Sequence, residues 1–234
     1  MADIALILTR PEPGAGRFLS ALSAEARAVV MPVLSPLMTI EPLDWSGEIG
    51  PEVAAIFTSA NGVRFAPEGA GRRAFCVGAE TTRAAFARGW RAEQAGQTAD
   101  ALVARLTAAK GTAPLVHFAG VHRRGGIAER LAAEGHEVRV VEVYDQRLHP
   151  LTEAAREALA GPAIVPLFSP RTAEQFARET RSIALGHVHL VAMSAAVAQP
   201  LSGKPVAGMR VADAPTREEM VLAVEKLCRH IRLP

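Results

Sequence analysis

The chain of 234 residues is long enough for one large domain or two small ones, and its 49% hydrophobic and 21% charged residues are ordinary for a globular protein. The net charge of +2 is too small to indicate a nucleic-acid or membrane-surface partner. No apolar run is long enough to cross a bilayer, and Asp3 stands where a signal peptide would carry basic residues. Cys76 and Cys228 lack metal-ligand spacing, which predicts core thiols in a reducing, cytoplasmic location.

Short apolar runs alternate with helical patterns along the whole chain. The strands expected from these runs lie at 4–8, 28–33, 53–57, 74–77, 91–94, 115–118, 138–143, 164–168, 189–193 and 206–211. Ten strands alternating with helices predict an α/β fold with parallel sheets, and ten is twice the strand number of a flavodoxin-like domain.

Two irregular segments predict where the chain passes between domains. Pro32 and Pro36 flank a short apolar stretch, and proline cannot donate to a sheet ladder, so the chain is expected to leave the first sheet there. Residues 145–150 are polar and irregular and predict the return. The expected domains are therefore 1–36 with 147–234, and an inserted domain over 37–146.

One phrase of the sequence occurs twice. A buried strand ends in Phe57-Thr58-Ser59 and opens a helix, and Phe168-Ser169 repeats this later in the chain. Phe57 and Phe168 lie 111 positions apart by subtraction, as do Phe65 and Phe176. A single turn of this kind usually binds nothing, but two in register indicate duplicated domains, each with backbone N–H groups that could hold an anion.

Several kinds of site find no support in the sequence. His187 and His189 have a suggestive spacing but no nearby carboxylate or cysteine to complete a metal site. No Gly-x-Ser-x-Gly elbow, Walker loop or Gly-x-Gly-x-x-Gly follows a strand, and Gly14-Ala15-Gly16 is only a fragment of such a loop.

Hydroxyl groups, glycines and arginines remain at the predicted strand ends, where parallel α/β sheets bind ligands. Helix N-termini and arginines favour carboxylates or phosphates there, although each arginine alone also fits a solvated surface charge. The candidates are Thr9, Arg10, Thr58, Ser59, Gly78, Thr81, Gly120, Arg123, Arg124, Ser169 and Arg171. Tyr144, the only tyrosine, is expected at the C-terminal end of a strand, where it could equally be a structural aromatic.

The ordered set of these pieces resembles the uroporphyrinogen-III synthase family over nearly the whole chain. The matching segments are Thr9-Arg10-Pro11, Pro32-Val33-Leu34, Ile56 to Asn61, Val77 to Thr81, Leu131 to Gly135 leading into Val143-Tyr144, and Phe168-Ser169-Pro170. A second Gly-x-x-Thr segment of the family is changed here, because Ser194 replaces its glycine and Val197 its threonine. The resemblance adds Asn61 and Ser194 to the candidate substrate-binding residues.

The resemblance implies two flavodoxin-like, three-layer domains joined by a two-stranded connection, with hinge motion between them. It implies a cytoplasmic, monomeric enzyme without cofactor that converts the linear tetrapyrrole hydroxymethylbilane to uroporphyrinogen III. Loss of the terminal hydroxyl would give an azafulvene, which attacks the substituted carbon of the last pyrrole and forms a spiro intermediate. Tyr144 is then the candidate that helps the hydroxyl leave. Two other functions stay open: a two-domain binding protein for an anionic small molecule, and a transferase with a nucleotide-linked donor.

Overall fold

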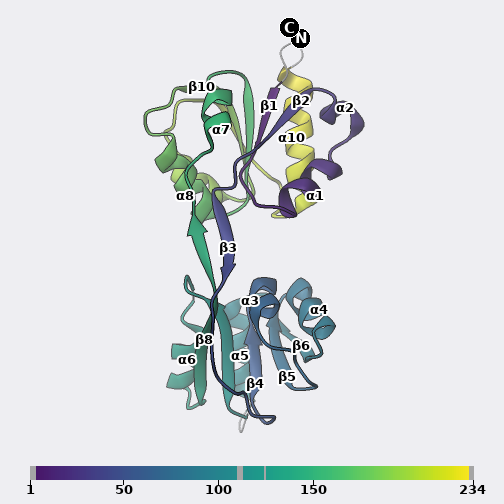
Figure 1. The fold of residues 1–234 in the computed structure, drawn as a ribbon, viewed down its shortest axis with the longest axis vertical. Helices are drawn as coiled ribbons and strands as arrows, with labels where there is room; N and C mark the ends of the chain where they lie inside the picture. Colours follow the sequence, from purple (N-terminus) through teal and green to yellow (C-terminus); the bar gives the residue numbers. More distant parts are fainter. Residues whose placement is uncertain (1–3, 110–112, 124, 232–234) are drawn as a thin grey trace. The chain divides into compact units, whose positions relative to one another are not determined.

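The computed structural model describes residues 4–109, 113–123 and 125–231, and Figure 1 shows the course of the chain. The residues form two compact units: unit 1 is Met1–Thr39 with Arg147–Pro234, and unit 2 is Ile40–Gln146. The expected boundary after residue 36 lies three positions before the observed one, and the expected boundary after residue 146 coincides with it. Among the described residues, no helix is long and apolar enough to span a membrane.

Unit 1 contains one five-stranded parallel sheet in the order β11-β10-β9-β1-β2. Its strands are β1 (Ile4–Leu8), β2 (Val30–Leu34), β9 (Ala163–Leu167), β10 (Leu185–Ala192) and β11 (Val206–Val211). Numbered in chain order within the unit, this is the 2-1-3-4-5 order of a flavodoxin-like sheet. The order reverses at β1 and β9, and ligands of doubly wound sheets bind beyond the carboxyl ends of strands at such a point.

Helices cover both faces of this sheet and bury a separate apolar cluster on each (Figure 1). On one face lie α1 (Gly14–Ala21), α2 (Ala24–Arg27) and α10 (Arg217–Ile231). On the other lie α7 (Glu153–Ala158), α8 (Pro170–Glu179), α9 (Ala195–Ala198) and the 3-10 turn η1 (Gln199–Leu201). The strands β1 and β9 are buried along their whole length, which explains why they read as unbroken apolar runs.

Unit 2 contains a six-stranded sheet in the order β3-β8-β7-β4-β5-β6. Its strands are β3 (Met38–Pro42), β4 (Ala54–Phe57), β5 (Arg73–Val77), β6 (Arg91–Gly96), β7 (Leu115–Gly120) and β8 (Val138–Leu148). The strands β4 to β8 pair in parallel and the order reverses at β4 and β7. The helices α3 (Ala60–Phe65) and α4 (Ala79–Ala87) pack on one face, and α5 (Ala99–Ala108) and α6 (Ile127–Ala133) on the other.

The strands β3 and β8 correct two sequence predictions. The structure describes eleven strands rather than ten, because β3 lies where the sequence predicted a crossing followed by a loop. Residues 145–148, expected to be irregular, continue β8. The bonds Leu43 N–Val143 O and His149 N–Leu37 O run as in an antiparallel pair, so each of these polar segments supplies the other's backbone partners. Pairing thus overrides the weak local preference of both segments.

The two units have the same strand arrangement when unit 1 is read from its third strand. The order β11-β10-β9-β1-β2 matches β6-β5-β4-β7-β8 position by position, so β9 corresponds to β4 and β1 to β7. The strands that the repeated phrase links, β4 and β9, are therefore equivalent, and each lies at the reversal point of its own sheet. The chain order is permuted, because the last two strands of the unit 1 pattern come first in the sequence.

Candidate active site

The turn from β4 to α3 in unit 2 places two neighbouring hydroxyls on opposite faces of the sheet. Of the two hydroxyl residues Thr58 and Ser59 that the sequence offers as a cap, Ser59 caps α3 by accepting a hydrogen bond from Asn61 N at 3.1 Å. Its hydroxyl oxygen lies 3.5 Å from the hydroxyl oxygen of Tyr144. Thr58 turns to the other face, where Oγ1 lies 3.5 Å from Nε2 of His117. Alternation along an extended chain separates the two hydroxyls.

Tyr144 lies inside β8 and not at its C-terminal end, because β8 continues to Leu148. Only 7% of its surface is exposed, and its ring centroid is 6.1 Å from that of Phe65. Gly120, the last residue of β7, pairs with Tyr144 in the sheet. A Cβ atom on Gly120 would come within 2.6 Å of the tyrosine ring, so this glycine provides the space that the ring occupies.

The turn from β5 to α4 is open and uncapped. Gly78 has φ +76°, and a Cβ atom there would meet nothing within 4 Å. No side chain caps α4, so its first-turn N–H groups are available to an anion. Thr81, one turn on, is only 6% exposed and belongs to the buried part of the helix. Gly78 therefore fits the predicted close approach of backbone to ligand, whereas Thr81 offers little surface.

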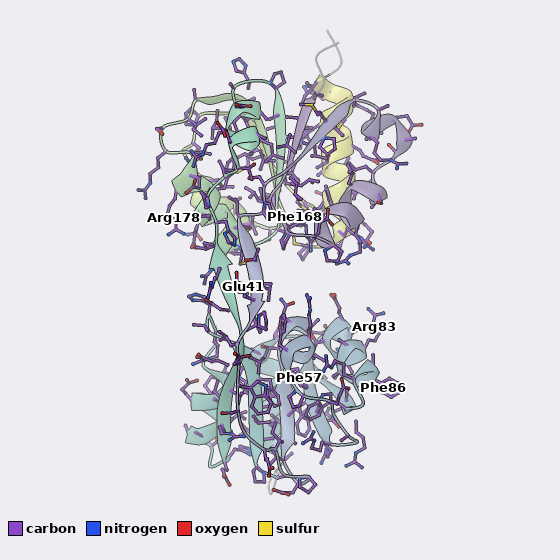
Figure 2. All side chains as sticks on the ribbon, in the orientation of Figure 1. Glu41, Phe57, Arg83, Phe86, Phe168 and Arg178 are labelled. Atoms are coloured by element: carbon purple, nitrogen blue, oxygen red, sulfur yellow. The ribbon has the colours of Figure 1, made fainter. Side chains whose placement is uncertain are left out.

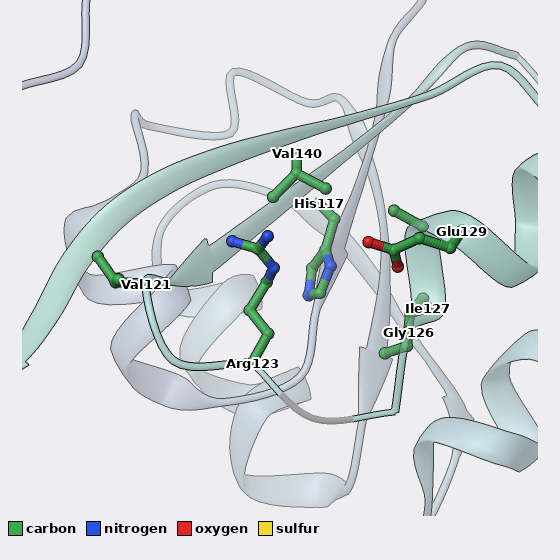
Figure 3. Close-up of a pocket in the computed structure, with 8 residues that line it drawn as sticks. His117, Val121, Arg123, Gly126, Ile127, Glu129 and Val140 are labelled. Atoms are coloured by element: carbon green, nitrogen blue, oxygen red, sulfur yellow. The ribbon is translucent and has the colours of Figure 1, made fainter.

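A cavity of about 210 Å³ lies beside β7 on the Thr58 face (Figure 3). His117 stands between the guanidinium of Arg123 and the carboxylate of Glu129 in this view. Arg123 forms an ion pair with Glu142 of β8, so this candidate already has an acidic partner. Burial, with a smaller effect of Arg123, lowers the pKa of His117 to about 4, which leaves the imidazole neutral at pH 7. Arg124 lies outside the described residues.

The strand ends of unit 1 use their polar groups internally. Thr9 is buried and donates from Oγ1 to the Pro166 carbonyl oxygen at 3.0 Å. The Arg10 guanidinium lies 4.6 Å from the centroid of the Phe168 ring. Ser169 caps α8 by accepting from Thr172 N at 3.2 Å. The structure thus groups Thr9, Arg10 and Ser169 around the β1 and β9 ends, while Arg171 follows in the first turn of α8.

Comparison with known proteins adds the family. Residues 20–222 match the model of the family described as uroporphyrinogen-III synthase HemD. The chain belongs to the uroporphyrinogen-III synthase family. Its activity is that of this family, a cyclising lyase of tetrapyrrole biosynthesis. No match was found among curated proteins.

Two solved synthase structures share the fold. The uroporphyrinogen-III synthetase of Helicobacter pylori aligns with a TM-score of 0.67 and 14% identity, over 96% of this chain and 99% of that one. A mutant uroporphyrinogen III synthase from the extremely thermophilic bacterium Thermus thermophilus aligns with a TM-score of 0.58 and 16% identity, over 97% of this chain and 99% of that one. Both alignments span the two units, so this chain has the synthase fold along its length.

The synthase departs from the expected family pattern at the start of α9. Ser194 is the N-cap residue of this helix, yet its side chain makes no capping hydrogen bond. Val197 is 2% exposed and packs in the apolar cluster between the sheet and α8. The valine that replaces a threonine is thus a core residue, and Ser194 is the remaining candidate for substrate contact in this segment.

The sequence reasoning missed His117 and Glu142. His117 interrupts the apolar run of β7, and a polar residue inside a buried strand was the signal available in the sequence. No feature of the sequence marked Glu142 as a partner of Arg123, because their pairing depends on the register of β7 and β8. Among the described residues no cluster of three or more His, Cys, Asp or Glu side chains could hold a metal ion.

Proposed function

We propose that this synthase converts hydroxymethylbilane to uroporphyrinogen III with Tyr144 as the proton donor to the leaving hydroxyl. The observation that carries the assignment is the cluster of Ser59, Gly120 and Tyr144 at the reversal point of the unit 2 sheet. It supplies one phenol, which packs against Gly120 at the end of the neighbouring strand. The phenol oxygen lies 3.5 Å from the Ser59 hydroxyl, with which it can form a hydrogen bond.

The reaction needs one proton at its start and releases one at its end, and a phenol can supply the first and take back the second. The terminal hydroxyl takes a proton from Tyr144 and leaves as water, giving the azafulvene as its protonated cation beside the phenolate. The azafulvene carbon then bonds to the substituted carbon of the last pyrrole and forms the spiro intermediate. The spiro carbon then releases the preceding bridge carbon, and that bridge carbon bonds to the free α-carbon of the same pyrrole, which inverts the ring. The proton lost from this α-carbon on rearomatisation returns to the phenolate. A phenol is a weak acid, so its contribution lies near the low end of ~10²–10⁴ in rate.

Orientation supplies the larger part of catalysis in this proposal. Closing the ring at the substituted carbon requires the two chain ends to be held in one geometry, and such positioning is worth ~7–11 kcal/mol. The protein can hold the substrate in this geometry by binding its eight carboxylates. In unit 2 the backbone N–H groups after Gly78 and Ser59 bind carboxylates, with Asn61 in the first turn of α3 beside them. Thr58 and Arg123 lie on the other face of the sheet, and Thr81 is buried in α4. In unit 1 the corresponding groups follow Ser169, with Thr9, Arg10, Arg171 and Ser194.

The proposal includes a monomeric, cytoplasmic enzyme that needs no cofactor. It is tested by incubating the purified protein with hydroxymethylbilane and separating the oxidised products. A type III product formed faster than the spontaneous type I product supports the synthase. Formation of type I alone, with tight binding of the tetrapyrrole, would instead support a binding protein, and tight binding of a nucleotide sugar would support a transferase.

A further inference from the structure

His117 is a buried polar side chain that the proposed mechanism does not use. It lies on β7 opposite Ile56 of β4, where the order of the sheet reverses, and only 4% of its surface is exposed. The residues on its own face of β7, Leu115 and Ala119, are apolar and only 2% and 5% exposed, so an apolar residue would fit the same environment. An apolar side chain would also avoid the free energy needed to bury an imidazole.

The hydrogen-bonding partner of His117 is the residue next to Ser59. Nε2 of His117 lies 3.5 Å from Oγ1 of Thr58, and Thr58 and Ser59 follow one another at the end of β4. Ser59 in turn lies 3.5 Å from the hydroxyl of Tyr144 on the opposite face. The backbone of this turn is therefore held by polar contacts on both faces, from His117 on one and from Tyr144 on the other.

We infer that His117 is a positioning residue of the synthase, which holds Thr58 and so fixes the direction in which Ser59 meets Tyr144. The inference rests on the proposed role of Tyr144. The neutral imidazole suits this task, because it carries one donor and one acceptor nitrogen and pairs with a hydroxyl in either tautomer. The charged groups that act on the ring are Arg123 and Glu129, which line the cavity.

The position of the histidine makes a role in packing alone distinguishable from positioning. If His117 only filled space, leucine would replace it with equal or higher stability and unchanged turnover, since a buried polar group is removed. If His117 positions the turn, the same change keeps or raises stability but lowers turnover. Stability and activity then move independently, and in the second case they can move in opposite directions.

The experiment compares four variants with the wild-type synthase: His117→Leu, His117→Gln, Thr58→Val and the double variant Thr58→Val with His117→Leu. Glutamine places an amide nitrogen near the position of the imidazole Nε2, and valine keeps the shape of threonine without its hydroxyl. We expect kcat to fall about tenfold in His117→Leu and in Thr58→Val, and the double variant to lose no more than either single variant. His117→Gln should retain kcat within about threefold. His189→Leu, in β10 of unit 1, is the matched control and should leave kcat unchanged.

Wild-type turnover to the type III isomer is measured first, so that a failure of the proposed reaction is seen before any variant is interpreted. Multiplicative losses in the double variant would overturn the inference, because they indicate independent roles. So would unchanged kcat in a stably folded His117→Leu protein. If His117→Leu does not fold, Thr58→Val and His117→Gln decide alone: a loss in the first with retention in the second supports positioning, and any other combination contradicts it. Should Tyr144→Phe prove fully active while His117→Leu is impaired, the role of Tyr144 fails and the coupling of His117 to Thr58 stands separately.

Discussion

The two units of the synthase share one strand arrangement but differ in what their equivalent strand ends do. At the reversal point of unit 1, Thr9 donates to the Pro166 carbonyl oxygen and Ser169 bonds within the first turn of α8. At the reversal point of unit 2, Gly120 leaves space and Tyr144 fills it with its hydroxyl beside Ser59. The repeated sequence phrase therefore identifies the shared frame, whereas the chemistry depends on residues that are not repeated.

The same difference separates the second pair of equivalent turns. Gly78 of unit 2 has a positive φ of +76° with ψ 155° and is open on its outer side, while Ser194 of unit 1 has φ −161° in the extended region. One turn on, Thr81 corresponds to Val197, and both are buried. Figure 2 shows the equivalent aromatic residues Phe57 and Phe168, each in its own unit. Phe57 is fully buried, but Phe168 is partly exposed and carries Arg10 over its ring. The strand ends of unit 2 thus leave more backbone accessible to a ligand, whereas those of unit 1 use their polar groups in contacts within the protein.

The largest effect is expected when the space that unit 2 keeps for Tyr144 is filled. In Gly120→Ala, the new Cβ would lie 2.6 Å from the tyrosine ring, so the ring must move away from Ser59. We expect kcat to fall by on the order of several hundredfold, measured as formation of the type III isomer. Gly186→Ala in β10 of unit 1, where a Cβ meets nothing within 4 Å, should retain full activity. Normal turnover in Gly120→Ala would show that the reaction does not depend on the position of Tyr144.

A pH dependence of stability should distinguish the histidines of the two units. The pKa of His117 is lowered from 6.5 to about 4 in the folded protein, so the unfolded chain binds a proton at higher pH than the folded chain does. Stability attributable to His117 is present above pH 6.5 and is lost as the pH falls towards about 4, by roughly 3 kcal/mol at most. Urea unfolding at several pH values measures this slope, and His117→Leu should remove it. The partly exposed His189, whose pKa is lowered by burial and then by His230 and Arg210, should contribute less.

Much of this frame could be predicted from the sequence, because apolar runs, caps and glycines act locally. Ser59, Thr98 and Ser169 cap the helices that the sequence predicted, and Gly89 ends α4 with φ +76°. Cys76 and Cys228 are both buried, as expected of core thiols.

The remaining features depend on residues distant in the sequence. The strand β3 and the second half of β8 have little apolar pattern and exist because they pair with one another. Arg123, which the sequence offered as an anion-binding candidate or a solvated surface charge, has Glu142 as an ion-pair partner. Likewise, Gly120 was predicted to be a ligand-binding glycine, and its packing against Tyr144 follows only from the register of β7 and β8. Register and pairing partner are properties of the folded chain that no local pattern states.

Removing the phenol of unit 2 should slow the reaction without changing the product. Tyr144→Phe keeps the ring that packs on Gly120 and Phe65 and removes only the hydroxyl beside Ser59. We expect kcat to fall about tenfold to a hundredfold, with the type III isomer still the main product because orientation is retained. The measurement is the initial rate together with the isomer ratio. An unaltered rate would reduce Tyr144 to a packing residue, and a switch to type I would assign it to orientation.

The open turn at Gly78 should affect binding more than chemistry. Gly78→Ala puts a side chain at φ +76° and over the N–H groups of α4, so we expect KM to rise about tenfold with a smaller change in kcat. A positive φ together with ψ 155° is a conformation that side chains other than glycine rarely adopt, so its strain by itself costs about 1–3 kcal/mol of stability. Gly203→Ala is the matched control in unit 1, because Gly203 has φ +81° and equally open surroundings. Both variants should lose stability, and only Gly78→Ala should weaken substrate binding. A parallel rise of KM in both would attribute the effect to strain.

The smallest effect compares the two serines of the repeated phrase. Ser59→Ala and Ser169→Ala each remove a helix cap, so each should lower the free energy of unfolding by about 1 kcal/mol, measured by urea unfolding. Ser59→Ala also removes the hydroxyl that lies 3.5 Å from that of Tyr144. Its kcat should therefore fall a few-fold as well, which is less than the fall expected for Tyr144→Phe. Ser169→Ala should leave kcat within about twofold, because the backbone N–H groups that bind carboxylate remain. If Ser59→Ala were slower than Tyr144→Phe, the serine and not the tyrosine would be the group that assists the leaving hydroxyl.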